Sequence, residues 1–375
     1  MPLSLTLDPS TRNLILADDH RIHRLHPIWL RERTTEPGMV DEGNRQRLYD
    51  PADLPDDLRG VAIDRIGDGT TVRIAWSDGH AQNINLTDVA RELGWLPDPE
   101  TPPTSEPWST EPVPFPRVPF PADGDDSGLH KALDLFWRLG FVVLGGTSTE
   151  PDALLHLATR FGSIRTTNFG TLFDVISAEN PSDLAYTTMG LSAHSDNPYR
   201  RPVPGIQFLH SLRNDASGGD STLVDGLAAA VELDDLDPIG YRALATTQVT
   251  FRYQFGADAY ANSSPMIETD TEGRVIAVQN ADRHDYVDAV RPERLTDFYR
   301  ARRTFRQLVN DPSRQASFRL AEGDLLMMDN RRLLHGRTEY SLDAGGRHLQ
   351  GCYVEHDGPD LAWRRLARSR RSSSV

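Results

Sequence analysis

The sequence predicts a mainly β protein with flanking helices (α+β), in which a small β-rich domain precedes a larger one. Three observations predict this. Short runs rich in β-branched and aromatic residues, separated by Gly, Asp or Asn, follow one another through the second half of the chain. Helix-period runs lie mainly ahead of them. A proline-rich stretch divides the chain. Many spaced strands with helices at one end favour a closed or two-sheet antiparallel barrel flanked by helices.

Residues 1–96 form the predicted small β-rich domain. Its expected strands cover residues 14–17, 61–65 and 71–76, and Thr87 is expected to cap a helix that runs through Leu93. A domain of this size can fold alone.

Residues 97–123 form the predicted linker. They contain ten prolines. Prolines at this density prevent a regular helix or a central strand and favour an extended, stiff connector. We therefore place a domain boundary in this stretch.

Residues 124–363 form the predicted larger domain. Apolar residues at helical spacing from Leu129 to Leu139 predict a helix that ends at Gly140. The other expected helices cover residues 151–160 and 292–309. The expected strands cover residues 141–144, 206–210, 249–253, 275–278, 318–320, 325–328 and 348–354. Residues 364–375, which are basic and Ser-rich, are expected to be a frayed tail.

Charge and cysteine content exclude several classes of protein. Lys and Arg total 40 against 55 Asp and Glu, and the formal charge of −15 argues against binding nucleic acid or anionic lipid. Cys352 is the only cysteine, so an intrachain disulfide and a zinc site of several thiolates are ruled out. Charged residues interrupt the N-terminal thirty positions, which do not resemble a signal or transit peptide. We expect a cytoplasmic protein without a membrane partner, and the extra domain makes a homodimer plausible.

A candidate metal site begins at His194 and Asp196. On a strand, residues two apart point to the same face, so this imidazole and carboxylate can converge on one ion. The pair alone fits a surface ion pair as well. His335 adds a third ligand, and two His with one carboxylate form a facial triad that leaves three adjacent positions for a 2-oxo acid and dioxygen on Fe(II). Zinc also accepts these ligands, so a zinc hydrolase stays open.

Arg347 favours the Fe(II) oxygenase over the zinc hydrolase. A dicarboxylate that chelates iron through its oxo acid end needs a cation for its far carboxylate, and a guanidinium can hold it bidentately. Ser221, at the end of the tight turn 218–221, offers a hydroxyl to the same carboxylate. A purely structural role for Arg347 is the alternative.

Several ordered blocks resemble the γ-butyrobetaine hydroxylase and trimethyllysine hydroxylase group, within the wider family that includes taurine dioxygenase. The blocks are Ile28–Arg33, Leu184–Thr188, His194–Arg200, Pro204–Gln207, Gly218–Ser221, Val224–Gly226, Asp329–Arg337 and Arg347–Leu349. The resemblance implies a double-stranded β-helix (jelly-roll) catalytic domain. It also implies that His194, Asp196 and His335 bind Fe(II), and that Arg347 and Ser221 hold the co-substrate 2-oxoglutarate.

The resemblance also implies a quaternary ammonium substrate. A trimethylammonium has no hydrogen to donate, so it is recognised by cation–π contact and apolar enclosure. By alignment the cage residues are Phe169, Phe173, Tyr186 and Tyr353; without the resemblance, core packing would explain them better. Asp183 stands where the group has an asparagine. Asn280 lies where the group contacts the acidic end of the substrate, and Arg283 is a further candidate there.

From these residues we rank three expected substrates. Hydroxylation of γ-butyrobetaine to carnitine comes first, 2-trimethylaminoethylphosphonate follows, and trimethyllysine is third. A non-catalytic metal-binding homologue is the alternative of a different class, and retention of all three ligands with Arg347 speaks against it.

One departure from the group concerns zinc. Relatives commonly carry zinc-binding cysteines just after the Trp-Leu-Arg segment, where this chain has Thr34, Thr35 and Glu36. His80 corresponds to the remaining ligand, and one histidine does not hold structural zinc. We expect no structural zinc.

Overall fold

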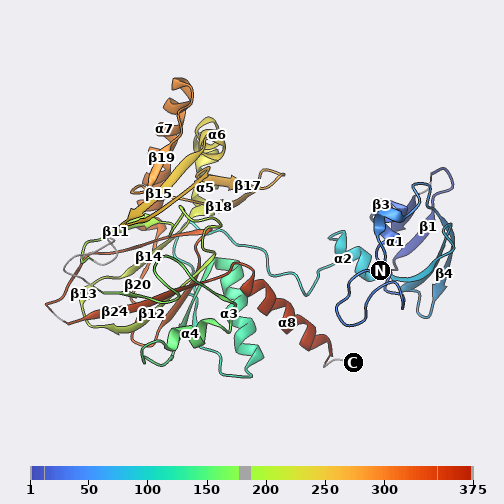
Figure 1. The fold of residues 1–375 in the computed structure, drawn as a ribbon, viewed down its shortest axis with the longest axis horizontal. Coiled ribbons are helices and arrows are strands. Elements are labelled where there is room, and N and C mark those ends of the chain that lie inside the picture. The colour runs from blue at the N-terminus through green and yellow to red at the C-terminus, as the bar shows by residue number, and fades with distance from the viewer. Residues whose placement is uncertain (1, 12, 177–186, 344, 373–375) are drawn as a thin grey trace. The chain divides into compact units, whose positions relative to one another are not determined.

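The computed structural model describes residues 2–11, 13–176, 187–343 and 345–372, and it divides the chain into two compact units, Met1–Pro99 and Glu100–Val375 (Figure 1). Most regular structure is strand, with helices in both units. Within the described residues, no helix is both long and apolar enough to cross a membrane.

The first unit contains two three-stranded antiparallel sheets. Their strands are β1 (Ser4–Leu7), β2 (Leu14–Ala17), β3 (Ile22–Leu25), β4 (Gly60–Ile66), β5 (Thr71–Trp76) and β6 (Ala81–Asn85). The helical segments are α1 (Pro27–Arg31), the 3₁₀ turn η1 (Pro51–Asp53) and α2 (Leu86–Glu92). Alternate apolar residues of the strands form its core with Leu30 and Leu86.

Two details of this unit bear on the predictions. Asn85, not Thr87, caps α2, because the Asn85 side chain accepts from the backbone N–H groups of Thr87 and Asp88. At the positions considered for zinc, the Thr34 hydroxyl lies 3.3 Å from Nε2 of His80. The expectation of no structural zinc stays a prediction.

The second unit is built on two sheets. The larger has seven strands, in the order β10-β24-β12-β21-β8-β7 with β9 beside β24, and the smaller has the order β11-β22-β14-β20. The larger contains β7 (Arg117–Pro119), β8 (Phe141–Gly145), β9 (Ile164–Arg165), β10 (Phe173–Val175), β12 (Ile206–Asn214), β21 (Leu325–Asp329) and β24 (Arg347–Val354). The smaller contains β11 (Leu191–His194), β14 (Ser221–Asp225), β20 (Ala316–Phe318) and β22 (Leu333–Arg337).

The two sheets share one apolar core. Phe141 and Val143 of β8 pack in the same cluster as Leu223 of β14 and Leu333 of β22. Val142, which alternates with them, belongs to a second cluster on the other face of the larger sheet. The larger sheet is therefore covered on both faces, by the smaller sheet and by helices.

The helices on that second face are α3 (Asp126–Leu139), α4 (Ala153–Ala158) and α8 (Gly358–Ser372) (Figure 1). Gly140 ends α3 with a left-handed φ of +83°, as predicted. The prediction of a frayed tail from residue 364 was wrong. Helix α8 continues to Ser372 because Trp363 and Leu366 are buried in this cluster, and Trp363 stacks on His130 with ring centroids 4.5 Å apart.

A further group of elements adjoins the smaller sheet. It comprises α5 (Gly226–Leu236), α6 (Pro238–Thr246), β15 (Val249–Phe255), β16 (Asp258–Ser264), β17 (Ile267–Thr269), β18 (Val275–Val278), β19 (Asp285–Val287) and α7 (Pro292–Asn310). The sequence predicted α7, β15 and β18 but missed α5 and α6. Asp225 caps α5, and Asp237 ends it and caps α6.

The linker was predicted too long, because residues 100–123 belong to the second unit. Trp108 is buried, and its backbone N–H donates to Oδ2 of Asp225 while Nε1 donates to the carbonyl of Leu139. Strand β7 pairs in parallel with β8 at the edge of the larger sheet, where proline is tolerated. Several other bounds shift: α4 begins at Ala153 after Asp152 with φ +66°, β20 lies two residues earlier than expected, and β12 continues to Asn214.

Candidate active site

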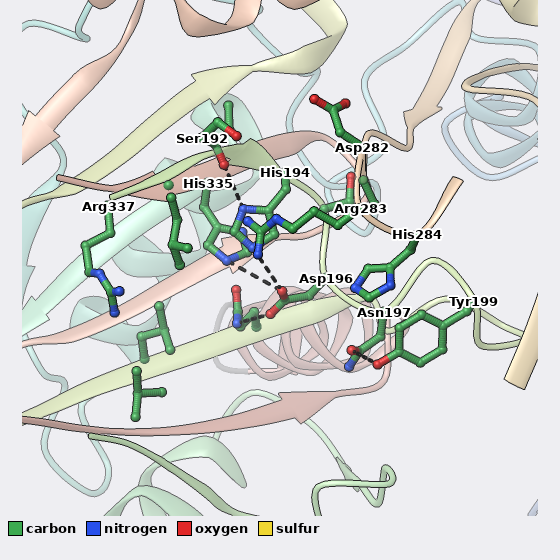
Figure 2. Close-up of a pocket in the computed structure, with 18 of the residues that line it drawn as sticks. Ser192, His194, Asp196, Asn197, Tyr199, Asp282, Arg283, His284, His335 and Arg337 are labelled. Atoms are coloured by element: carbon green, nitrogen blue, oxygen red, sulfur yellow. Dashed lines mark hydrogen bonds and ion pairs between the residues drawn. The ribbon is translucent and has the colours of Figure 1, made fainter. Parts of the chain in front are cut away.

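His194, Asp196 and His335 come together at the smaller sheet (Figure 2). His194 lies opposite His335 in the β11–β22 pairing, with ring centroids 4.3 Å apart. Oδ1 of Asp196 lies 3.5 Å from Nε2 of His194 and 3.6 Å from Nε2 of His335. All three ligand atoms lie within 4.8 Å of one another. Two imidazoles and a carboxylate at this spacing suit one divalent cation.

Hydrogen bonds to a buried side chain, and not a strand, position Asp196. Strand β11 ends at His194, so Asp196 lies just beyond it and the expected strand alternation does not position it. Its backbone N–H donates to Oδ1 of Asn330 at 2.7 Å, and Nδ2 of Asn330 donates back to the Asp196 carbonyl at 3.0 Å. Asn330 is fully buried and also donates to the carbonyl of Pro204. The side-chain amide of Asn330 therefore fixes the loop that carries Asp196.

The Asp196 carboxylate has one oxygen engaged and one turned toward the histidines. Oδ2 accepts from the Tyr353 hydroxyl at 2.7 Å and from Nε2 of Gln207, whereas Oδ1 faces both imidazoles. Burial acts to raise the pKa of Asp196, but His335 and His194 outweigh it and hold that pKa below its usual range. The carboxylate is thus ionised, with Oδ1 oriented as a ligand.

Both histidines are suited to metal binding. Nδ1 of His194 lies 2.9 Å from the Ser192 carbonyl, which favours the tautomer with its Nε2 lone pair toward the site. Burial and then the nearby His194 lower the pKa of His335 to about 4. A neutral imidazole is the form that binds a metal ion.

A cavity adjoins the triad, and its walls are of two kinds (Figure 2). Phe169, Phe173 and Tyr353 line it, with centroids 6.2 Å apart for the two phenylalanines and 5.5 Å apart for Phe173 and Tyr353. Polar residues that the sequence did not single out also line it: Ser192, Asn197, Tyr199, Gln207, Asp282, His284 and Arg337. For Asn197, Tyr199, Gln207 and Arg337 the signal was their place in the blocks of resemblance, whereas Ser192, Asp282 and His284 lie outside those blocks.

Three further predicted substrate residues are Asp183, Tyr186 and Asn280. Asp183 and Tyr186 lie outside the described residues. Asn280 is buried and is not among the lining residues; its Nδ2 donates to the carbonyl of Ala193 at 2.8 Å, and its own carbonyl accepts from the N–H of Ser195. In the structure Asn280 supports the strand that carries His194.

Arg347 and Ser221 are buried and are not among the residues that line the cavity, whereas Arg337 is. Ser221 pairs with Arg337 across β14 and β22. The guanidiniums of Arg337 and Arg347 lie 4.9 Å and 5.4 Å from the centroid of one ring, that of Tyr340. Burial, followed by the charge of Arg337, lowers the pKa of Arg347 to about 10.

This cationic pair fits a carboxylate ligand. Nε and Nη1 of Arg347 are buried and have no hydrogen-bond partner among the described residues. A buried charge with unsatisfied donors is unfavourable by itself and is relieved by an anion. The donor set therefore matches the far carboxylate of a metal-chelating 2-oxo dicarboxylate.

Comparisons with known proteins agree with this chemistry. Residues 100–353 match the model of the family described as taurine catabolism dioxygenase TauD, TfdA family. The γ-butyrobetaine dioxygenase of Pseudomonas sp. (strain AK-1) is 36% identical over 346 residues, covering 90% of this chain and 89% of the relative. The human γ-butyrobetaine dioxygenase is 30% identical over 359 residues, covering 89% of each.

Other relatives are also dioxygenases by name. Dioxygenase str8 of Strobilurus tenacellus is 32% identical, covering 88% of this chain and 82% of the relative. A solved putative α-ketoglutarate-dependent taurine dioxygenase from Burkholderia xenovorans has a TM-score of 0.50 at 13% identity, covering 68% of this chain and 91% of that one, which supports the fold alone. The chain belongs to the TauD, TfdA family and is an Fe(II)- and 2-oxoglutarate-dependent dioxygenase, and its His-Asp-His group could hold the metal.

Proposed function

We propose that this dioxygenase hydroxylates a small trimethylammonium substrate that also carries an anionic group, with γ-butyrobetaine, converted to carnitine, as the first candidate. The observation that carries the proposal is the aromatic wall beside the triad. Each face of an aromatic ring attracts a cation by about 0.5–2 kcal/mol, and a quaternary ammonium needs no hydrogen-bond acceptor. The names of the most similar relatives support the same choice.

The residues have separate roles in this proposal. His194, Asp196 and His335 hold Fe(II), and Arg347 with Ser221 holds the far carboxylate of 2-oxoglutarate. The bound metal and co-substrate together supply the activation of dioxygen that oxidises a C–H bond. Tyr353 and Gln207 orient Asp196 through its Oδ2. The aromatic wall fixes the ammonium end, so that one methylene of the substrate lies nearest the metal.

Arg283 is proposed to attract the anionic end. It lines the cavity, is exposed, and its charge lowers the pKa of His335, which places it near the triad. The neighbouring Asp282 is paired with Arg306 at 2.6 Å, so that carboxylate is already engaged elsewhere. A cation at this point favours a carboxylate or phosphonate on the substrate. 2-Trimethylaminoethylphosphonate is therefore the second candidate, ahead of trimethyllysine.

We further propose the double-stranded β-helix for the second unit, since two facing antiparallel sheets enclose its core. The first unit would be a separate small domain, and the whole chain a cytoplasmic homodimer. Gel filtration with light scattering tests the oligomeric state.

The test of function is anaerobic reconstitution with Fe(II) and 2-oxoglutarate, followed by aerobic measurement of succinate release. γ-Butyrobetaine, 2-trimethylaminoethylphosphonate and trimethyllysine are compared with 4-aminobutyrate, which keeps the carboxylate but lacks the methyl groups. We expect strong stimulation by one trimethylammonium compound, none by 4-aminobutyrate, and loss of activity in His194→Ala. Bound iron and 2-oxoglutarate without stimulation by any of them would refute the substrate class and favour a non-catalytic role.

A further inference from the structure

Phe173 occupies a slot in the backbone of the neighbouring strand. It lies in β10, which pairs with β24 at one edge of the larger sheet, and its direct partner in the register is Gly351. A Cβ placed on Gly351 would lie 2.4 Å from both Cε2 and Cζ of the Phe173 ring. Carbon atoms in contact are about 3.5–4.0 Å apart. The ring can rest there only because residue 351 has no side chain.

The backbone at residue 351 does not itself require glycine. Gly351 is buried in the middle of β24, and its φ is not in the left-handed region where side chains are disfavoured. A strand interior is also a position where glycine is unfavourable. The close approach of the Phe173 ring is therefore the structural reason that accounts for glycine here.

The slot faces the cavity. Tyr353, two residues along β24 and so on the same face, lines the cavity and has its ring 5.5 Å from that of Phe173. Leu209, which pairs with Gly351 from β12 on the other side, also lines it. The position of the Phe173 ring thus helps set the width of the aromatic wall.

The strand that carries Phe173 is bound to β24 through side chains as well as through its backbone. Oδ1 of Asp174 lies 2.6 Å from Nε2 of His348 and accepts from Nε2 of Gln350 at 3.1 Å. These bonds tie β10 to β24 next to the slot. A side chain at residue 351 would therefore displace the ring more readily than the strand, and the ring would move away from β24 into the cavity.

We propose that Gly351 is a specificity-determining residue: its missing side chain seats Phe173 against β24 and keeps the cavity wide enough for a trimethylammonium group. The inference rests on the proposed function. Gly351 is not among the residues that line the cavity, whereas Phe173 is, so Gly351 acts as a positioning residue through Phe173. An alanine at this position should narrow the ammonium end of the cavity and leave the metal and 2-oxoglutarate sites unchanged.

The test compares four proteins: wild type, Gly351→Ala, Phe173→Leu and the double variant. Binding of γ-butyrobetaine is measured anaerobically by calorimetry on the complex with Fe(II) and 2-oxoglutarate, and 2-oxoglutarate binding is measured separately. We expect Gly351→Ala to raise the Kd of γ-butyrobetaine by about tenfold or more, in the range that pocket-size changes produce, and to leave the Kd of 2-oxoglutarate within about threefold. In the Phe173→Leu background the same alanine should change the γ-butyrobetaine Kd by less than about threefold.

Each outcome separates the inference from the function. If the wild-type protein binds 2-oxoglutarate but neither γ-butyrobetaine nor 2-trimethylaminoethylphosphonate, the proposed function is refuted, and the inference with it. Wild type that binds while Gly351→Ala binds equally well refutes the inference alone. A tenfold loss that persists in the Phe173→Leu background also refutes it, because the alanine would then act independently of the ring. If Gly351→Ala does not fold, the double variant, which lacks the clash, should fold and bind as Phe173→Leu does; failure of both to fold overturns the inference.

Discussion

The Tyr353 hydroxyl is predicted to contribute to iron affinity, which Tyr353→Phe tests directly. The substitution keeps the ring that lines the cavity and removes only the O–H that donates to Oδ2 of Asp196 at 2.7 Å. Gln207 would be left as the remaining donor described for that oxygen. The carboxylate would then be freer to rotate, and Oδ1 would be less firmly directed toward His194 and His335.

The size of the effect follows from the kind of bond. A hydrogen bond to an ionised group contributes about 1.5–3 kcal/mol, and loss of a partner behind a metal ligand typically lowers metal affinity by about tenfold to a hundredfold. We expect the Kd for Fe(II) to rise within that range. The same hydroxyl helps to lower the pKa of Asp196, so the variant should also lose metal at a higher pH than wild type on acidification.

The assay is anaerobic titration with Fe(II), with Tyr199→Phe as the matched control. Tyr199 also lines the cavity, but its hydroxyl donates to Oδ1 of Asn197 at 2.6 Å and not to a metal ligand. We expect Tyr199→Phe to leave the Fe(II) Kd within about threefold. Equal affinities for wild type and Tyr353→Phe would refute the orienting role, and equal losses in the two variants would show that the effect is not specific to Asp196.

Three further predictions concern charge. Arg347→Met should raise the KM for 2-oxoglutarate by about a hundredfold while Fe(II) affinity changes little, because a bidentate charged contact is lost; an unchanged KM would move that role to Arg337. Asp225→Asn keeps the oxygen that caps α5 but removes the negative charge 2.7 Å from the buried guanidinium of Arg332. The free energy of unfolding, measured by urea denaturation, should therefore fall by about 3–5 kcal/mol. An unchanged denaturation midpoint would contradict this. The Asp329 carboxylate, whose Oδ2 lies 3.6 Å from Nε2 of His356, raises the pKa of His356, so the stabilisation from this ion pair is present below about pH 6.5 and is lost as the pH rises through the raised pKa. The difference in Tm between wild type and His356→Gln should therefore shrink from pH 6 to pH 9, and a constant difference would show that the pair does not titrate as described.

The sequence predicted well where the pattern is local. Strands β2, β5 and β18 have the predicted bounds, since their apolar residues lie between clear turn signals. Gly140 ends α3 in the left-handed conformation expected of it. The grouping of His194, Asp196 and His335 was also predicted, because two separate blocks of resemblance contain the three residues. These features depend on residues close in sequence or on motifs that can be recognised.

Features that depend on distant partners were not predictable in the same way. The residues predicted to be a frayed tail belong to α8 because Trp363 packs into the apolar cluster on the larger sheet. No local sequence pattern reveals that apolar surface. Asn330 holds the Asp196 loop from far along the chain, as Tyr353 does from another strand. Asn280 was assigned to substrate by alignment, although in the structure its amide supports the backbone of β11. Such roles follow from the pairing of strands and cannot be read from spacing.

The arm formed by residues 100–123 has a consequence for shortening the chain. Trp108 is buried in the core between the two sheets, and β7 covers the edge of β8. A chain beginning at Glu100 would keep both, whereas one beginning after Asp123 would expose an apolar surface and an open strand edge. We expect the first to be a soluble, metal-binding protein and the second to aggregate on expression, so the chain should be shortened ahead of this arm, at Glu100, and not at the end of the proline-rich stretch.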